Sequence, residues 1–341
     1  MSRVSILGAG AWGTALAIVL GRKGIHDVRL WAREKEVYDA IALRHVNDIF
    51  LPGCPIPKSV SVTTEYERCI QGVEILVCAV PSQHCRVVFQ EIKRYLQPQM
   101  LLVSATKGLE QSSLLRMTSV ISEVVGAEAH SAPRVGALSG PSFAKEVAQG
   151  DPTAITIASK DAAFAQTVQQ VFSDASFRVY RNDDVTGVEL GGALKNVIAI
   201  AAGVCDGLGL GHNSIAALIT RGLAEITRLV VACGGREQTM AGLAGLGDLV
   251  LTCTGELSRN RSVGVELGRG KKLPEILSNM RGTVAEGIFT TYAAVGLARA
   301  QGIEMPITEQ MHSILRDGKP PREAIHELMT RSAKSEANLG S

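Results

Sequence analysis

The first residues of the chain join a short apolar strand to a glycine-rich turn and the start of a helix. Residues 3–7 read Arg-Val-Ser-Ile-Leu, as in a buried strand, and Gly8, Gly10 and Gly13 follow in the spacing G-x-G-x-x-G. In this context the glycines let the backbone approach a pyrophosphate, and the helix N-terminus offers N–H groups to it. The stretch predicts a dinucleotide-binding sheet. The alternative is a tight turn from strand to helix whose glycines have this spacing by chance.

The end of the second expected strand bears on the choice between the two nicotinamide cofactors. This strand, at 28–31, is followed by Ala32, Arg33 and Glu34. An acidic residue at this place accepts hydrogen bonds from the ribose of NAD, whereas a guanidinium suits the 2′-phosphate of NADP. Arg33 favours NADP, and NAD stays open because Glu34 reaches the ribose if the register differs by one residue. A solvated arginine at a strand end is the alternative without a cofactor role.

Strands and helices alternate through the first half of the chain and give way to helices in the second. Strands are expected at 59–62, 74–80, 100–105, 134–138, 154–158 and 177–180, and helices among them at about 81–96, 114–125 and 162–172. Later helices are expected at about 185–205, 213–233, 258–268, 285–301, 306–316 and 321–331. The fold class is therefore α/β, because alternation of this kind gives a mainly parallel, doubly wound sheet. We expect a Rossmann-like dinucleotide-binding domain over residues 1–184 and an all-helical, substrate-binding domain over residues 185–341.

One lysine is expected in the middle of a helical face that is otherwise small or apolar. At 3.6 residues per turn, Lys195 shares this face with Val188, Gly191, Gly192, Ile198, Ala199 and Ala202. Burial there disfavours the ammonium and lowers its pKa toward the range in which a neutral amine takes a proton. Lys195 is therefore a candidate general base. The alternative is a lysine whose stem lies along the apolar surface while its head reaches solvent.

A carboxylate is also expected in a partly buried position. Asp248 follows Gly247 and precedes an apolar run at 249–251. A buried carboxylate needs a partner, and Lys195 is the obvious candidate. Because a carboxylate raises the pKa of a neighbouring lysine, Asp248 would orient Lys195 and set its proton affinity rather than simply activate it. A helix-capping aspartate is the alternative.

Two stretches have the residues of an anion site. Ser258, Arg259 and Asn260 open an expected helix, where charge, hydrogen-bond donors and the helix dipole act together on an anion such as a phosphate. Lys107 precedes Gly108 at the carboxyl end of a buried strand, and is likewise placed for an anionic ligand. The alternatives are an ordinary N-cap followed by surface charges, and a solvated lysine.

Two further loops are expected beyond the carboxyl ends of strands, where such sheets bind ligands. Residues 139–144 turn sharply into a helix, so their N–H groups could face the cofactor or the substrate. Pro81 could support a nicotinamide ring. Plain turn chemistry and a proline at the first position of a helix are the respective alternatives.

Composition argues against several other classes of protein. A formal net charge of +2 is too near zero to indicate nucleic acid or a membrane surface as a partner. Seven cysteines form no Cys-x-x-Cys pair, so neither a disulfide framework nor a metal site is expected. The longest apolar runs are about half the roughly 20 residues that cross a bilayer, and the N-terminus lacks a signal-peptide pattern. We expect a cytoplasmic protein without stable membrane insertion.

The motif around Lys195 resembles the signature of the NAD(P)-dependent glycerol-3-phosphate dehydrogenases. It comprises residues 192–197, Gly203, Gly207, Asn213 and the run at 221–225. The resemblance extends over nearly the whole chain, through the motifs at 8–13, 107–108, 140–144, 247–248 and 258–260.

This resemblance implies reversible hydride transfer between NAD(P)H and dihydroxyacetone phosphate, giving sn-glycerol 3-phosphate for phospholipid synthesis. It implies a catalytic set of Lys195, Asp248 and Lys107, in which Lys195 takes the proton of the C2 hydroxyl in oxidation and returns it in reduction. The residues implied for the substrate are Lys107, Gly140, Ser142, Lys195, Asp248, Ser258, Arg259 and Asn260. Those implied for the cofactor, besides Gly8, Gly10 and Gly13, are Ala11, Trp12, Arg33, Lys107, Ala144, Arg259, Val284 and Glu286.

Two other functions stay open on the sequence. A related β-hydroxyacid dehydrogenase shares the two-domain plan and a catalytic lysine, but acts on a carboxylate in place of a phosphate. A non-catalytic NADP-binding sensor would bind cofactor without turnover, and would leave Lys195 and Asp248 unexplained. The small residues at 203–211 would pack helices within one chain or between two, so a homodimer is one option.

Overall fold

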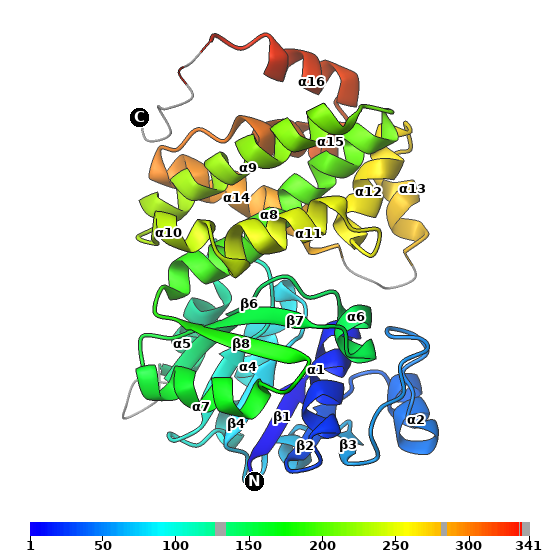
Figure 1. Ribbon diagram of the computed structural model, residues 1–341, viewed down its shortest axis with the longest axis vertical. Coiled ribbons are helices and arrows are strands. Elements are labelled where there is room, and N and C mark those ends of the chain that lie inside the picture. The colour runs from blue at the N-terminus through cyan, green and yellow to red at the C-terminus, as the bar shows by residue number, and fades with distance from the viewer. Residues whose placement is uncertain (127–133, 281–284, 334, 336–341) are drawn as a thin grey trace. The chain divides into compact units, whose positions relative to one another are not determined.

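The computed structural model divides the chain into two compact units (Figure 1). The first holds residues 1–106 and 117–185, and the second holds residues 107–116 and 186–341. The structure describes residues 1–126, 134–280, 285–333 and 335. The domain boundary expected after residue 184 stays a prediction.

The first unit is built on an eight-stranded sheet with the order β3-β2-β1-β4-β5-β6-β7-β8. Its strands are β1 (Arg3–Leu7), β2 (Asp27–Trp31), β3 (Val60–Thr63), β4 (Ile75–Cys78), β5 (Leu101–Ser104), β6 (Arg134–Ser139), β7 (Thr153–Ala158) and β8 (Phe177–Asn182). Neighbouring strands run parallel, except that β6 and β7 are antiparallel. The mainly parallel sheet predicted from the sequence is confirmed.

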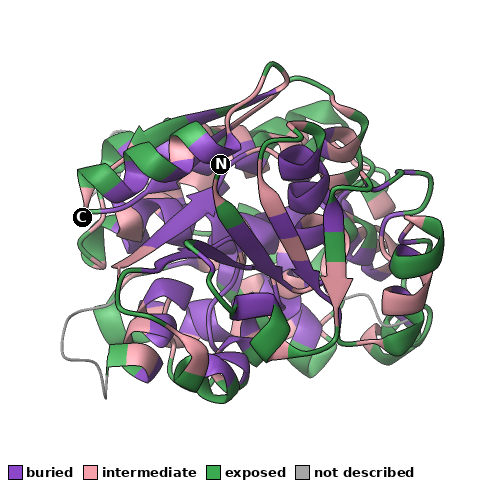
Figure 2. Ribbon diagram, turned by 90° about the horizontal axis from the view of Figure 1, so that it is seen from below, coloured by how far each residue is buried: buried purple, intermediate pink, exposed green. Residues whose placement is uncertain are grey.

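Helices lie on both faces of this sheet (Figure 2). They are α1 (Ala11–Arg22), α2 (Lys35–Arg44), α3 (Tyr66–Ile70), α4 (Cys85–Ile92), α5 (Met117–Gly126), α6 (Ala144–Gln149) and α7 (Ala162–Phe172). Every residue of β4 and β5 is buried, because helices cover both faces of the central strands. This burial explains why those strands read as continuous apolar runs rather than as alternating patterns.

The second unit is helical, and the described part of it contains no β-strand. Its helices are α8 (Val185–Gly207), α9 (His212–Ala232), α10 (Glu237–Met240), α11 (Asp248–Thr254), α12 (Arg259–Gly268), α13 (Leu273–Ser278), α14 (Glu286–Gln301), α15 (Pro306–Asp317) and α16 (Pro321–Met329). Among the described helices, α8 alone is long and apolar enough to cross a membrane, yet its most apolar stretch is entirely buried inside the protein. Burial of this kind is typical of a core helix.

Glycines let α8 and α12 meet backbone to backbone. A Cβ atom on Gly264 would stand 1.9 Å from the carbonyl oxygen of Ile200. One on Gly203 would stand 2.0 Å from the carbonyl oxygen of Arg261. No larger residue fits at either position without separating the helices. The start of α12 is therefore held in a fixed place relative to the helix that carries Lys195.

The segment between β5 and α5 differs from the expected helix at 114–125. The helix begins at Met117, because Leu114 has a φ of 62° and a backbone bridge pairs Leu109 with Arg116. The Arg116 guanidinium donates a hydrogen bond of 2.6 Å to Glu189 of α8. Residues 107–116, called the 107–116 loop below, thus belong to the second unit, and they carry Lys107 into it.

Candidate active site

The turn after β1 has the backbone geometry that a pyrophosphate requires. Gly8 has a φ of 109°, and a Cβ on Gly13 would stand 1.9 Å from the carbonyl oxygen of Gly8. The turn itself therefore requires glycine at both positions. A Cβ on Gly10 would meet no atom within 4 Å, so the backbone at the N-terminus of α1 is left open to a ligand. The residues fit a bound dinucleotide, whose phosphates would face the N–H groups of α1.

Asn47 supports this turn and has no counterpart among the sequence motifs. Its side-chain amide is buried and donates hydrogen bonds to the carbonyl oxygen of Ala9 at 2.8 Å and to the Thr14 hydroxyl at 2.9 Å. Ala11 and Trp12, expected at the cofactor, are half-buried in the first turn of α1.

Arg33, which was expected to bind the 2′-phosphate of NADP, lies just beyond β2 and is exposed. Its guanidinium forms an ion pair with Glu34, with Nη2 and Oε1 2.7 Å apart. The two residues that were weighed for NADP and for NAD therefore contact each other. An ion pair this exposed contributes little stability, so a phosphate can compete for Arg33 at low cost.

The turn after β6 is also one that only glycine suits. Gly140 has a φ of 141°, and a Cβ on it would stand 2.9 Å from the Cα of Ile155. The hydroxyl of Ser142 donates a hydrogen bond of 2.9 Å to the carbonyl oxygen of Gly140, and Ala144 begins α6. The structure places these three residues in the first unit, as it does the glycine turn. Their contact with a ligand stays a prediction.

In the second unit, Asp248 joins the two lysines expected at the reacting centre. Lys195 donates one hydrogen bond to Asp248 Oδ1 at 2.5 Å and another to the Thr252 hydroxyl at 2.7 Å. Lys107 donates to the second carboxylate oxygen, Oδ2, at 2.8 Å. Asp248 is completely buried, and Lys195 is 6% exposed. The pairing of Asp248 with Lys195 that the sequence suggested is therefore present, with Lys107 and Thr252 added to it.

Burial lowers the pKa of Lys195 to about 8. The charge of Asp248 acts in the opposite direction, and the nearby ammonium of Lys107 lowers the pKa further. An amine with such a pKa is present in both its protonated and its neutral form near neutral pH. Lys195 is thus able either to release or to accept a proton, which general acid–base catalysis in two directions requires.

The local backbone explains how Asp248 reaches Lys195. A π-helical turn (Leu243–Gly247) precedes α11, and Asp248 is the first residue of that helix. A Cβ on Gly191 of α8 would stand 2.6 Å from the carbonyl oxygen of Ala244 in this turn. The glycine therefore lets the turn lie directly on α8, one helical turn from Lys195. The sequence indicated the burial of Asp248 but neither the π-helical turn nor α11.

A chain of side-chain amides links this cluster to two other helices. Asn196 donates to the carbonyl oxygen of Lys107 at 3.4 Å and accepts a hydrogen bond of 2.9 Å from Asn260 of α12. The Asn260 oxygen in turn accepts from the backbone N–H of Gly287 in α14 at 3.0 Å. Asn260, expected at the substrate, thus helps to hold α8, α12 and α14 together. Asn196 was not predicted, although it directly follows Lys195.

The start of α12 combines a helix cap with an exposed cation. The Ser258 hydroxyl accepts a hydrogen bond from the backbone N–H of Arg261 at 3.2 Å, so Ser258 is the N-cap. Arg259 makes no hydrogen bond or ion pair with any residue that the structure describes. The surrounding protein lowers the pKa of Arg259 by desolvation, while Glu286 at the start of α14 opposes this shift. Val284 lies outside the described residues.

Comparison with known proteins decides the family. A family model described as the N-terminus of NAD-dependent glycerol-3-phosphate dehydrogenase matches residues 3–165, and the model of its C-terminus matches residues 184–326. The chain belongs to the NAD-dependent glycerol-3-phosphate dehydrogenase family. The resemblance noted in the sequence is confirmed.

Members of this family match the chain over nearly its whole length. A glycerol-3-phosphate dehydrogenase (NAD(P)+) of Koribacter versatilis is 63% identical over 339 residues, covering 99% of this chain and 100% of the relative. One of Acidobacterium capsulatum is 54% identical, covering 98% and 100%. The crystal structure of glycerol-3-phosphate dehydrogenase from Coxiella burnetii has a TM-score of 0.91 at 41% identity, covering 97% of this chain and 99% of that one.

Proposed function

We propose that the chain interconverts dihydroxyacetone phosphate and sn-glycerol 3-phosphate by hydride transfer with NAD(P)H. The observation that carries this proposal is the buried cluster of Lys195, Asp248 and Lys107 in a chain that matches this dehydrogenase family from end to end. The nicotinamide, when bound, supplies or accepts the hydride. The protein then has to orient the carbonyl, move one proton and hold the phosphate.

Lys195 moves the proton. In reduction its ammonium protonates the C2 oxygen as the carbonyl becomes an alcohol, and in oxidation its neutral amine takes the proton of the C2 hydroxyl. A pKa of about 8 suits both directions, because neither form of the amine is rare near neutral pH. The hydrogen bonds to Asp248 and Thr252 fix the direction in which Nζ points.

Lys107 gives the cluster an excess of positive charge. Two ammonium groups share one carboxylate, so the cluster carries a net charge of about +1 when both are protonated. The Lys107 side chain is 16% exposed and so remains accessible to a substrate. This charge attracts an anionic substrate and stabilises negative charge that develops on the C2 oxygen during reduction.

The phosphate binds at the start of α12. Arg259 offers a forked guanidinium that pairs with no described residue, and the first N–H groups of the helix add donors and a positive dipole end. Ser258 contributes as the residue that caps and orders this helix start. The amide of Asn260 fixes the helix start to α8 and α14.

The cofactor binds at the turn of Gly8, Gly10 and Gly13, with Arg33 beside its ribose. The open backbone at Gly10 supports this placement, and the charge of Arg33 favours NADP while NAD is also used. Contacts of Lys107, Ala144, Arg259 and Glu286 with the cofactor belong to the same proposal. We further propose a cytoplasmic enzyme, with a homodimer as one option, whose product feeds phospholipid synthesis.

The test is the absorbance of reduced nicotinamide when purified protein meets three substrates separately. They are dihydroxyacetone phosphate, dihydroxyacetone and a β-keto acid, each assayed with NADPH and with NADH. Much faster oxidation with the phosphate ester than with dihydroxyacetone, and none with the keto acid, is the expected result, and the two cofactors are ranked in the same experiment. Oxidation with the keto acid alone would indicate a β-hydroxyacid dehydrogenase. Cofactor binding without turnover on any substrate would indicate a sensor.

A further inference from the structure

An open hollow with two arginines in its wall lies within the second unit, between α14, α15 and the 107–116 loop. It has a volume of about 450 Å³, and its walls include Gln111, Tyr292, Gly296, Arg299, His312 and Arg316. None of these residues belongs to the cluster around Asp248 or to the start of α12. The proposed dehydrogenase reaction therefore leaves this hollow unexplained.

Two arginines of the hollow have unused hydrogen-bond donors. Arg299 stands in the last turn of α14 and Arg316 in the last turn of α15, and both are exposed. Neither makes a hydrogen bond or an ion pair with any part of the chain that the structure describes. The negative end of each helix dipole attracts a cation to this place without using the guanidinium N–H groups. Those groups remain available to a ligand.

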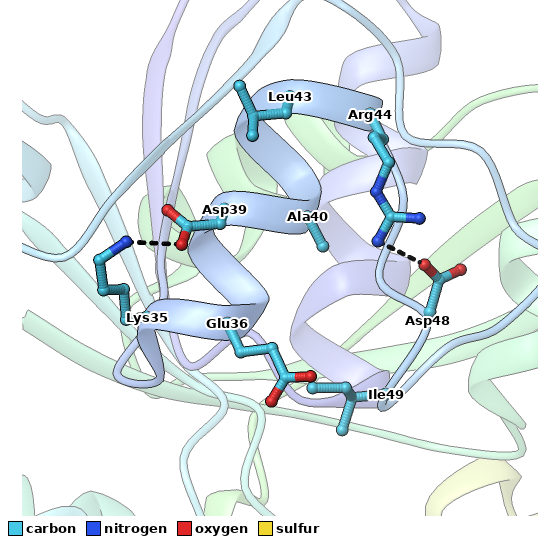
Figure 3. Close-up of a pocket in the computed structure, with 8 residues that line it drawn as sticks. All are labelled: Lys35, Glu36, Asp39, Ala40, Leu43, Arg44, Asp48 and Ile49. Atoms are coloured by element: carbon cyan, nitrogen blue, oxygen red, sulfur yellow. Dashed lines mark hydrogen bonds and ion pairs between the residues drawn. The ribbon is translucent and has the colours of Figure 1, made fainter.

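In a hollow beside α2 in the first unit, by contrast, the cations are paired with carboxylates (Figure 3). It is of similar size, about 470 Å³, and also has charged walls. There, however, Lys35 pairs with Asp39 at 2.6 Å and Arg44 pairs with Asp48 at 2.8 Å. Both cations of this hollow therefore have a carboxylate partner, and Glu36 adds a further negative charge, as on an ordinary solvated helix face. The hollow between α14 and α15 differs from it in having two arginines without a carboxylate partner among the described residues, so their donors are available to an anion.

His312 lies close to both arginines of the hollow between α14 and α15. Its ring is half-buried and packs edge-on against Tyr292, with ring centroids 5.5 Å apart. Burial lowers the pKa of His312, and the charges of Arg316 and Arg299 lower it as well. Asp317 acts in the opposite direction without reversing the shift. The charges of the two arginines therefore favour an added negative charge beside the ring, whereas Asp317 opposes it.

We propose that this hollow binds a small phosphorylated anion, at a site separate from the active site. Two guanidinium forks match the paired oxygens of a phosphate, and a hollow of about 450 Å³ has room for a small anion. This inference does not depend on the dehydrogenase activity.

The hollow is connected to the active site through the 107–116 loop. Gln111 belongs to this loop, as does Lys107 at its base. Leu114 packs on α14, because a Cβ on Gly296 would stand 3.1 Å from its side chain. A ligand in the hollow therefore contacts the same short loop that positions Lys107 against Asp248.

The proposal is tested by NMR of protein labelled with 15N in its histidines and titrated with inorganic phosphate. Chloride keeps the ionic strength constant, and His312→Gln identifies the resonance by its loss. We expect the His312 resonance to shift saturably and its pKa to rise, because a nearby anion favours the charged imidazole. The shift should persist in Arg259→Gln, which alters the substrate phosphate site, and in Arg322→Gln, which removes an exposed arginine of α16.

The double variant Arg299→Gln/Arg316→Gln should lose the shift. If it fails to fold, each single variant should still weaken phosphate binding roughly 10-fold or more, the value of one charged hydrogen bond. An unshifted His312 in the wild type would overturn the proposal. So would a shift that survives in the double variant or disappears in Arg259→Gln. An inactive dehydrogenase would leave this titration unaffected, so the two proposals fail separately.

Discussion

Lys195 and Asp248 form a buried ion pair in which Nζ and Oδ1 lie 2.5 Å apart. The lysine comes from α8 and the aspartate from the first residue of α11, so neither helix makes the pair alone. Removing one partner of such a pair leaves an uncompensated buried charge, which is strongly unfavourable. The two side chains are therefore held together in this pair. Burial keeps the pKa of Lys195 at about 8.

We expect pH to act in opposite senses on the two directions of the reaction. Oxidation needs the neutral amine of Lys195, so kcat/KM for glycerol 3-phosphate should rise through about pH 8. Reduction needs the ammonium, so kcat/KM for dihydroxyacetone phosphate should fall over the same range. In Asp248→Asn both transitions should move to lower pH, because the carboxylate raises the pKa of Lys195. Initial rates measured in neutral and alkaline buffers give the pH dependence of kcat/KM for each direction. If kcat/KM changed in the same sense with pH for oxidation and for reduction, the role of Lys195 would be contradicted.

Arg259→Gln should weaken the binding of the phosphorylated substrate. Loss of one charged hydrogen bond should raise KM for dihydroxyacetone phosphate roughly 10- to 100-fold, with a smaller change in kcat. With NADPH at a saturating concentration, the slower reaction of dihydroxyacetone, which has no phosphate, should be nearly unaffected. Arg269→Gln is the matched control, because Arg269 is the C-cap of the same helix and pairs only with Glu266 among the described residues. An equal loss on both substrates would argue against the phosphate role.

Gly264→Ala should destabilise the second unit. Its new methyl group would overlap the carbonyl oxygen of Ile200, so α12 must move away from α8. We expect a loss of roughly 1–3 kcal/mol or more in the free energy of unfolding, the usual cost of overpacking. Gly211→Ala serves as control, because a Cβ there meets no atom within 4 Å. Urea unfolding midpoints compare the two variants, and similar values for both would show that the close approach is unnecessary.

Glu225 should make stability depend on pH. It lies buried in α9 and accepts hydrogen bonds from the backbone N–H groups of Ile307 and Thr308 at the start of α15. Burial raises its pKa from 4.5 to about 7, so the folded protein binds the proton more tightly than the unfolded chain. The resulting stabilisation is complete below about pH 4.5 and is lost as pH rises through about 7.

The comparison variant for this effect is Glu225→Gln, which carries a neutral amide in both states. Relative to it, the wild type should lose on the order of 3 kcal/mol of unfolding free energy as pH rises from 4.5 to about 7. Urea titrations of both proteins at several pH values give this difference. A difference that stays constant would mean that Glu225 keeps an ordinary pKa inside the protein.

Local patterns accounted for most of the fold. The strand before Gly8 and the helix after it are defined by neighbouring residues, and the face of α8 around Lys195 follows from helical periodicity alone. Short elements such as α11, with seven residues, span too few turns to show a period. For this reason Asp248 was expected to be buried without any helix being assigned to it.

Long-range contacts were beyond the reach of the sequence pattern. The 107–116 loop joins the second unit because Lys107 pairs with Asp248 and Arg116 with Glu189, partners that are 141 and 73 residues away. Thr252 was missed, although it lies four residues after Asp248 and hence on the same face of α11. Asn47 gives no local signal, since its hydrogen bonds cross from the loop after α2 to the glycine turn.

The most direct test of the account is the turnover number of Lys195→Met in the reduction of dihydroxyacetone phosphate. Methionine is close to lysine in length and cannot transfer a proton. Because Lys195 lies in the second unit, its replacement should leave the glycine turn of the first unit undisturbed. We expect kcat to fall on the order of 10²- to 10⁴-fold, the usual contribution of a general acid, while NADPH still binds with its wild-type affinity. Turnover near that of the wild type would contradict the assignment of Lys195 as the group that moves the proton.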